Sequence, residues 1–265
     1  MGVNMQPLGL LQGLINNKLF MKKVLFLFCV GISALLVSCG KETEELDLGN
    51  VADYNLQKPG KYIIYQLDSL LYINFGQKDT VVSYQAKDSV AAQITDNLGR
   101  TAYRIFRFVR KNATDAWQPN NTFMTVPTSN GIEFIENNLR YNKLRQPLRD
   151  GFSWKGNTYI DTYSLGSEFK YLDDWDYLYE NVNQPYTSGP LTVDTTITVN
   201  QRDEVIGNIT DLNSFSEKNL SIEVYGKGIG LVYRNFLHRE YQPPTPGRAG
   251  YKLGYGVTMR MLSHN

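Results

Sequence analysis

Three carboxylates stand close together in the second half of the chain, where Asp173, Asp174 and Asp176 flank Trp175. Paired carboxylates can serve as acid and base in glycoside hydrolysis, and clustered carboxylate oxygens can hold Ca²⁺. The Asp-x-Asx-x-Asx-Gly spacing of an EF-hand loop is absent, however. An exposed acidic turn is therefore the favoured interpretation, and hydrolysis at this cluster ranks last among the functions considered.

Imidazoles and thiols are scarce, with only His238, His264, Cys29 and Cys39 in the whole sequence. This scarcity excludes most His/Cys metal sites and any multi-disulfide framework. Ser-His-acid catalysis also needs a nucleophile on a strained turn, and no Gly-x-Ser-x-Gly occurs. We expect His238 to be a surface or loop residue. The sequence predicts no catalytic residue, no metal ligand and no cofactor.

A glycine-rich run, Gly226-Lys227-Gly228-Ile229-Gly230, contains a lysine as phosphate-binding loops do. Such loops lead into a helix N-terminus, whereas strand-like residues follow here. The run therefore predicts a hairpin turn or a β-bulge.

Aromatic rings offer a further chemistry, the stacking of a sugar or another ligand. Trp154 and Trp175 are the candidate stacking residues, and the glycines around Trp154 make it the better candidate for an exposed ring. Core packing is the alternative for both rings.

Composition narrows the class of protein. The 265 residues include 27 Lys+Arg and 26 Asp+Glu, a formal net charge of +1, which argues against nucleic-acid binding. The hydrophobic fraction of 42% and the charged fraction of 20% indicate a globular chain. Tyrosine, at 18 residues, suits strands with one packed and one wet face.

The N-terminal part predicts an export signal. Two lysines follow Met21, and the apolar run 24–37 is shorter than the roughly 20 residues that span a bilayer. Leu36-Val37-Ser38-Cys39 resembles the bacterial lipobox, in which the cysteine is acylated and the chain is cut before it. The resemblance implies a signal peptide over 1–38 and membrane attachment through acyl chains on Cys39. Residues 1–20 lack a basic start, so we expect a mis-annotated extension ahead of Met21.

Residues 39–55 lack periodicity and predict a lipidated flexible tether. The basic-then-acidic segment 40–45 resembles the signal that sends Bacteroidota lipoproteins to the cell surface, with a solvated linker as the alternative. An outer-membrane location is expected. The periplasmic face and the cell surface both stay open.

Four tripeptides resemble the O-glycosylation acceptor of exported Bacteroidota proteins, an acidic residue followed by Ser or Thr and a small or aliphatic residue. Asp-Ser and Asp-Thr are also ordinary turn residues. The candidate acceptors are Ser69, Thr80, Ser89 and Thr195.

Residues 56–265 predict a single β-rich domain, because short runs of β-branched and aromatic residues alternate with turn signals. The clearest strand is 191–199, which alternates almost strictly, and 158–163 also reads as extended. Segment 169–179 fits a helix or a strand, and segment 61–75 predicts one long strand, or two that meet at a bend at Asp68-Ser69. The expected fold is all-β, an antiparallel curved sheet that forms a half-barrel or a barrel-like structure.

The mature chain resembles a group of uncharacterised Bacteroidota outer-membrane lipoproteins through segments 137–141, 151–157 and 225–233. The resemblance implies an envelope lipoprotein with a curved antiparallel sheet and carries no catalytic residues. We therefore expect a non-enzymatic binding or structural role, as an accessory part of an envelope or surface protein complex. The first alternative is a carrier of a lipid or other hydrophobic ligand in a β half-barrel. The second is a surface glycan-binding protein.

Overall fold

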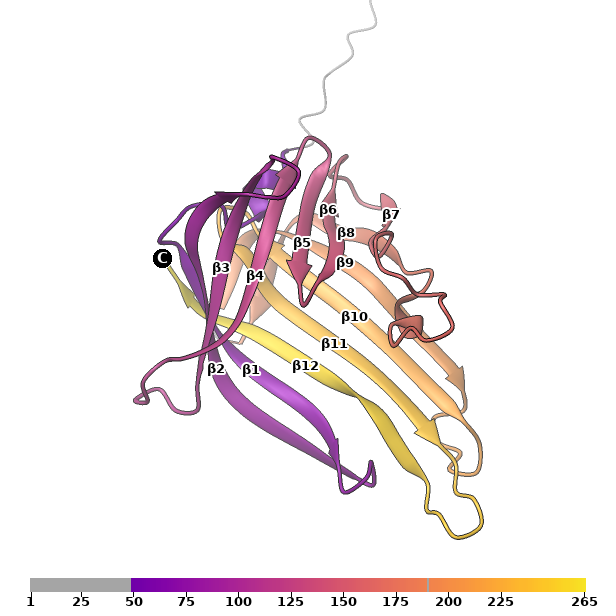
Figure 1. The fold of residues 1–265 in the computed structure, drawn as a ribbon. Helices are drawn as coiled ribbons and strands as arrows, with labels where there is room; N and C mark the ends of the chain where they lie inside the picture. Colours follow the sequence, from indigo (N-terminus) through magenta and orange to yellow (C-terminus); the bar gives the residue numbers. More distant parts are fainter. Residues whose placement is uncertain (1–48, 190) are drawn as a thin grey trace, which may run out of the picture. The chain divides into compact units, whose positions relative to one another are not determined.

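The computed structural model describes residues 49–189 and 191–265. The folded unit contains two short 3-10 helices and twelve strands (Figure 1). The helices are η1 (Val51–Tyr54) and η2 (Lys170–Leu172). The strands are β1 (Tyr62–Ile73), β2 (Lys78–Thr95), β3 (Thr101–Arg110), β4 (Gln118–Thr128), β5 (Gly131–Glu136), β6 (Leu139–Arg145), β7 (Ser153–Lys155), β8 (Asp176–Ser188), β9 (Leu191–Gly207), β10 (Ser216–Gly226), β11 (Gly230–Gln242) and β12 (Tyr251–His264).

The all-β prediction is confirmed: the strands form one antiparallel sheet that is nearly closed and barrel-shaped. The strand order is β6-β5-β4-β3-β2-β1-β12-β11-β10-β9-β8-β7. Every pairing joins strands that follow each other in the chain except β1 with β12, whose register runs from Ile63 opposite His264 to Leu71 opposite Tyr255. The chain thus starts in the middle of the sheet, winds to one edge, crosses to the other edge and winds back.

The two edges of the sheet meet between β6 and β7. The Asn142 N–H donates to the carbonyl of Gly156 at 2.8 Å, and the Trp154 indole donates to the Asn142 carbonyl at 2.7 Å. Further along β6, the Tyr179 hydroxyl accepts from the Arg145 N–H and donates to the Arg145 carbonyl. Side chains therefore complete a junction where the backbone ladder is short.

Several local expectations need correction. Of the two alternatives for segment 61–75, the single strand is confirmed and the bend at Asp68 is wrong, because β2 and β12 pair with a continuous β1 on both sides. Segment 158–163 consists of turns and irregular backbone. In segment 169–179, η2 is followed by the start of β8, so the segment is divided between a helical turn and a strand.

The folded unit also begins earlier than the expected boundary at residue 56. Val51 and Tyr54 of η1 are buried in the main apolar cluster, and Asn50 caps the helix by accepting from the Ala52 N–H at 2.9 Å. The Tyr54 hydroxyl donates to Asn183 on β8. The expected flexible tether over 39–55 is therefore wrong for residues 51–54.

Three long hairpins, β1–β2, β9–β10 and β11–β12, extend well past the short strands β5 and β6 (Figure 1). They carry exposed apolar side chains, which are Leu71, Ile73, Phe75, Val81, Val205, Ile206, Ile209, Leu212, Phe215, Leu253 and Tyr255. The register of β1 with β12 places Leu71 opposite Tyr255. This number of exposed apolar side chains on neighbouring hairpins favours a surface for interaction.

Candidate functional site

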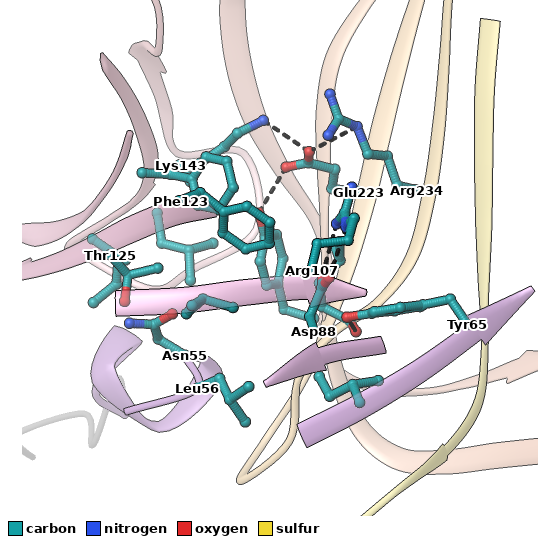
Figure 2. Close-up of a pocket in the computed structure, with 17 residues that line it drawn as sticks. Asn55, Leu56, Tyr65, Asp88, Arg107, Phe123, Thr125, Lys143, Glu223 and Arg234 are labelled. Carbon is teal, nitrogen blue, oxygen red and sulfur yellow. Dashed lines mark hydrogen bonds and ion pairs between the residues drawn. The ribbon is translucent and has the colours of Figure 1, made fainter. Parts of the chain in front are cut away.

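A cavity of about 70 Å³ lies on the inner side of the sheet. Its wall is built by every strand from β1 to β6, by β10 and β11, and by the two residues that follow η1 (Figure 2). Side chains alternate along a strand, and β1, β3, β4, β5 and β10 each present two residues that are two positions apart to this space. Many of the lining residues are apolar, and five are charged: Asp88, Arg107, Lys143, Glu223 and Arg234.

Asp88 on β2 and Arg107 on β3 form a closed pair across neighbouring strands. The Arg107 Nε and Nη2 donate to the two carboxylate oxygens at 2.7 Å each, the bidentate geometry that fits a guanidinium to a carboxylate. Both side chains are almost fully buried. Burial opposes the charge on Arg107, but the facing Asp88 carboxylate outweighs it, so the pKa of Arg107 is raised.

Glu223 on β10 is the acceptor of a second buried network. Lys143 Nζ donates to it at 2.8 Å, Gln201 Nε2 at 2.6 Å and the Tyr225 hydroxyl at 2.7 Å. Burial would raise the pKa of Glu223, yet the cations of Lys143 and Arg234 lower it overall. The carboxylate is thus held ionised.

The two cations around Glu223 differ in how well their charge is compensated. Burial opposes the charge on Arg234, but Glu223 and Glu136 outweigh it, so the pKa of Arg234 is raised. Burial lowers the pKa of Lys143 despite the attraction of Glu223. Arg234 Nε lies 3.5 Å from Glu223 Oε1, and this nitrogen is buried without a hydrogen bond. One carboxylate therefore serves two cations, and Arg234 is the more weakly held.

Buried polar atoms without a hydrogen-bond partner gather at this cavity. Asn55 Nδ2, Thr125 Oγ1 and Arg234 Nε all belong to residues that line it, and the Thr125 residue is only 3% exposed. The remaining buried unpartnered side-chain atoms in the described ranges belong to Arg239. Such atoms cost free energy unless water or a ligand satisfies them. The cavity can therefore accept a molecule that brings hydrogen-bond acceptors.

The candidate stacking residues are not exposed. Trp154 is 7% exposed and Trp175 is 2% exposed, and both belong to the main apolar cluster. Trp154 packs against Phe152, Tyr177 and Tyr179, with ring centroids 4.6 to 6.3 Å apart within this group. The expectation of an exposed Trp154 ring is wrong, because the closing edges of the sheet cover it.

The other candidate residues also find structural roles. Asp174 and Asp176 are exposed and pair with Lys155, which agrees with an acidic turn. Asp173 accepts from the Thr162 hydroxyl. The glycine-rich run 226–230 forms the turn between β10 and β11, as expected. Among residues 49–189 and 191–265, no group of His, Cys, Asp and Glu side chains could hold a metal ion.

His238 lies within β11 and is buried, so the expectation of a surface or loop histidine is wrong. Its ring stacks on Tyr171 with centroids 3.9 Å apart, and its Nδ1 lies 2.8 Å from Asn219 Oδ1. Burial lowers the pKa of His238, against the opposing effect of Glu217 and Glu240. The irregular segment around η2 folds onto this part of the sheet, and no local pattern in the sequence indicated it.

The predicted glycosylation acceptors all lie in strands and are partly exposed: Ser69 in β1, Thr80 and Ser89 in β2, and Thr195 in β9. Their modification stays a prediction. The lipidation residue Cys39 and the signal-peptide segment lie outside the described residues. Within the described part of the chain, no helix is long and apolar enough to cross a membrane.

Comparison with known proteins returns no relationship: no family model, no curated protein and no solved structure matches this chain. The class that the structure defines is thus an all-β unit with one nearly closed antiparallel sheet and a buried polar network on its inner side.

Proposed function

We propose that this protein is a non-catalytic binding protein of the bacterial envelope, anchored to the outer membrane by acyl chains on Cys39. It holds a small ligand in the cavity on the inner side of its sheet. The observation that carries the proposal is the gathering of three unpartnered polar atoms at one cavity, those of Asn55, Thr125 and Arg234. A chain selected for stability alone would gain by replacing such atoms with apolar groups of the same shape.

The size of the cavity limits the ligand. An apolar cavity of about 150 Å³ binds benzene, and this one, at about 70 Å³, has roughly half that volume. A ligand with a few carbon atoms fits. A complete long acyl chain does not, so the carrier function that we propose concerns a small amphipathic molecule.

The test is native mass spectrometry of the full lipoprotein, released from its own membrane in mild detergent. We expect a co-purified small molecule at close to one copy per chain. Thr125→Val should reduce its occupancy, whereas Thr187→Val, which alters an exposed hydroxyl that bonds Thr192 between β8 and β9, should not. Absence of any small molecule, together with no binding from a panel of small amphipathic compounds, would rule out this function.

A second function, accessory membership of an envelope protein complex, is favoured by the exposed apolar side chains of the long hairpins. Phe75, at the turn between β1 and β2, is 96% exposed. We expect a membrane-protein partner in a mild-detergent pull-down, lost with Phe75→Ser and Leu253→Ser. Leu98→Ser, in the turn between β2 and β3, alters an exposed leucine elsewhere and should keep the partner. Docking through these hairpins would be contradicted if all three variants recover the partner equally, or if all three lose it.

A further inference from the structure

The chemical class of the ligand can be read from the way Glu223 shares its bonds. Its two oxygens receive hydrogen bonds from Lys143, Gln201 and Tyr225. Arg234 is left with a 3.5 Å approach to Oε1 and no hydrogen bond at its Nε. A guanidinium presents several donors in a planar fork that matches a carboxylate. Arg234 therefore faces the cavity with donor capacity that no protein carboxylate takes up in full.

The other charges near the cavity do not fill this role. Arg107 donates hydrogen bonds to both carboxylate oxygens of Asp88. Glu136, at the end of β5, acts electrostatically on Arg107, Lys143 and Arg234, but it accepts from Asn121 and forms no ion pair among the described residues. Glu223 makes close contacts with two cations, Lys143 and Arg234, and of these two only Lys143 forms a hydrogen bond to it. An incoming carboxylate would supply the hydrogen-bond acceptor that the Arg234 Nε lacks.

A second pair of polar groups, on Asn55 and Thr125, lines the cavity away from Arg234. Figure 2 shows Arg234, Glu223 and Lys143 on one side of the cavity, and Asn55 and Thr125 on the other. Apolar side chains, Ile63 and Leu231 among them, supply the remaining lining. Asn55 Nδ2 and Thr125 Oγ1 are neutral groups that can bond a hydroxyl or carbonyl oxygen.

We infer that the cavity binds a short-chain carboxylic acid as its carboxylate, with a hydroxyl or carbonyl group toward the far end of the chain. The carboxylate lies on Arg234, the few carbons lie against the apolar lining, and the distal oxygen lies on Asn55 and Thr125. This inference rests on the proposed binding function and names its ligand class.

The test uses calorimetric titration of the full lipoprotein, kept in a neutral detergent, with three probes of matched length. These are 4-hydroxybutanoate, butanoate and 1,4-butanediol. We expect 4-hydroxybutanoate to bind best, at least tenfold more tightly than the diol, because only the diol lacks the charge that Arg234 receives. Butanoate should fall between them, because it lacks the distal oxygen.

Two variants locate the contacts. Thr125→Val should lower the affinity for 4-hydroxybutanoate several-fold and leave butanoate unchanged, because it removes only the distal partner. Arg234→Gln should abolish the preference for the acid over the diol. If Arg234→Gln fails to fold, Thr125→Val still tests whether the protein recognises the distal oxygen of the ligand. The comparison of the three probes on the unaltered protein still tests whether it recognises the negative charge.

The outcomes separate this inference from the function on which it rests. Equal binding of the diol and the acid, or a neutral co-purified molecule, would overturn the assignment of a carboxylate ligand. The proposed binding function would then still hold. If no probe binds and nothing co-purifies, the cavity holds ordered water only. This result would reject both the carboxylate ligand and the binding function.

Discussion

Removing the Asp88 carboxylate should destabilise this protein severely. Asp88→Asn leaves the Arg107 guanidinium buried without its counter-ion, at a site where both oxygens are bonded at 2.7 Å. Breaking a buried ion pair on one side costs about 3–5 kcal/mol, a large share of the roughly 5–15 kcal/mol that stabilises a typical domain. Arg107→Met strands the carboxylate in the same way and also removes the cation from above the Phe123 ring, 4.9 Å away.

The double variant Asp88→Asn/Arg107→Met should recover much of the loss, because neither charge then remains buried alone. Urea unfolding followed by tryptophan fluorescence measures the free energies of unfolding, and the buried rings of Trp154 and Trp175 report the transition. The four proteins of the cycle should give a coupling energy of about 2 kcal/mol or more.

The control is an exposed pair in the same sheet, Lys252 with Asp79, at 2.7 Å. Its cycle should give less than about 1 kcal/mol, because solvent screens both charges. A coupling between Asp88 and Arg107 no larger than this control value would refute the argument that burial makes the pair strong.

Two further perturbations test the packing and the titration of the inner face. Gly156→Ala should destabilise by about 1–3 kcal/mol in thermal or urea unfolding, because its Cβ would lie 2.3 Å from the Tyr177 ring; Gly166→Ala, which meets nothing within 4 Å, is the control, and equal effects would contradict the close approach. Burial lowers the pKa of His238 below its ordinary value of 6.5, so folding favours the neutral ring, and the stability this provides is present above pH 6.5 and lost as pH falls through the folded value. Unfolding free energies at pH 7 and pH 5 should therefore differ less in His238→Gln than in the unaltered protein, with the exposed His264→Gln as the control, and an undiminished pH dependence would exclude His238 as a source.

The class of fold followed from local signals. Alternation along 191–199 predicts a strand, and β9 contains it, although both faces of the strand are buried from Thr196 to Val199. The glycine-rich run at 226–230 predicts a turn, because strand-like residues follow it, and the turn connects β10 to β11. Such features depend on neighbours in sequence, which is the information that patterns contain.

The candidate site was missed because its residues come from strands far apart in the chain. Lys143 and Glu223 meet across the inner face although 80 positions separate them. In the sequence, Asp88 is singled out only as the acidic residue that precedes the candidate acceptor Ser89. A usable signal was present, however. In β3, Ile105 and Arg107 lie two residues apart on one face, and a charged residue in register with buried apolar ones indicates a buried pair.

The tryptophans show the opposite case, in which the sequence predicts a site that the structure does not form. Trp154 and Trp175 are of the residue type that forms stacking platforms, but both are buried in the core. Trp154 is covered where β6 meets β7, and Trp175 packs on Phe236 of β11 and donates to the Tyr171 carbonyl of η2. Except for the bond to Tyr171, these contacts join separate segments of the chain, so no window of sequence around either ring contains all of them.

The pairing of β1 with β12 has a consequence for the order in which the molecule can be made. Of the twelve strands, β1 is synthesised first and β12 (residues 251–264) last, and β12 supplies the neighbour for both β1 and β11. Until β12 emerges, the growing chain holds two groups of hairpins whose facing borders have open hydrogen-bonding groups. The sheet therefore cannot be completed before residues 251–264 have emerged. Until then, a nascent chain would need protection from premature association at those two borders in particular.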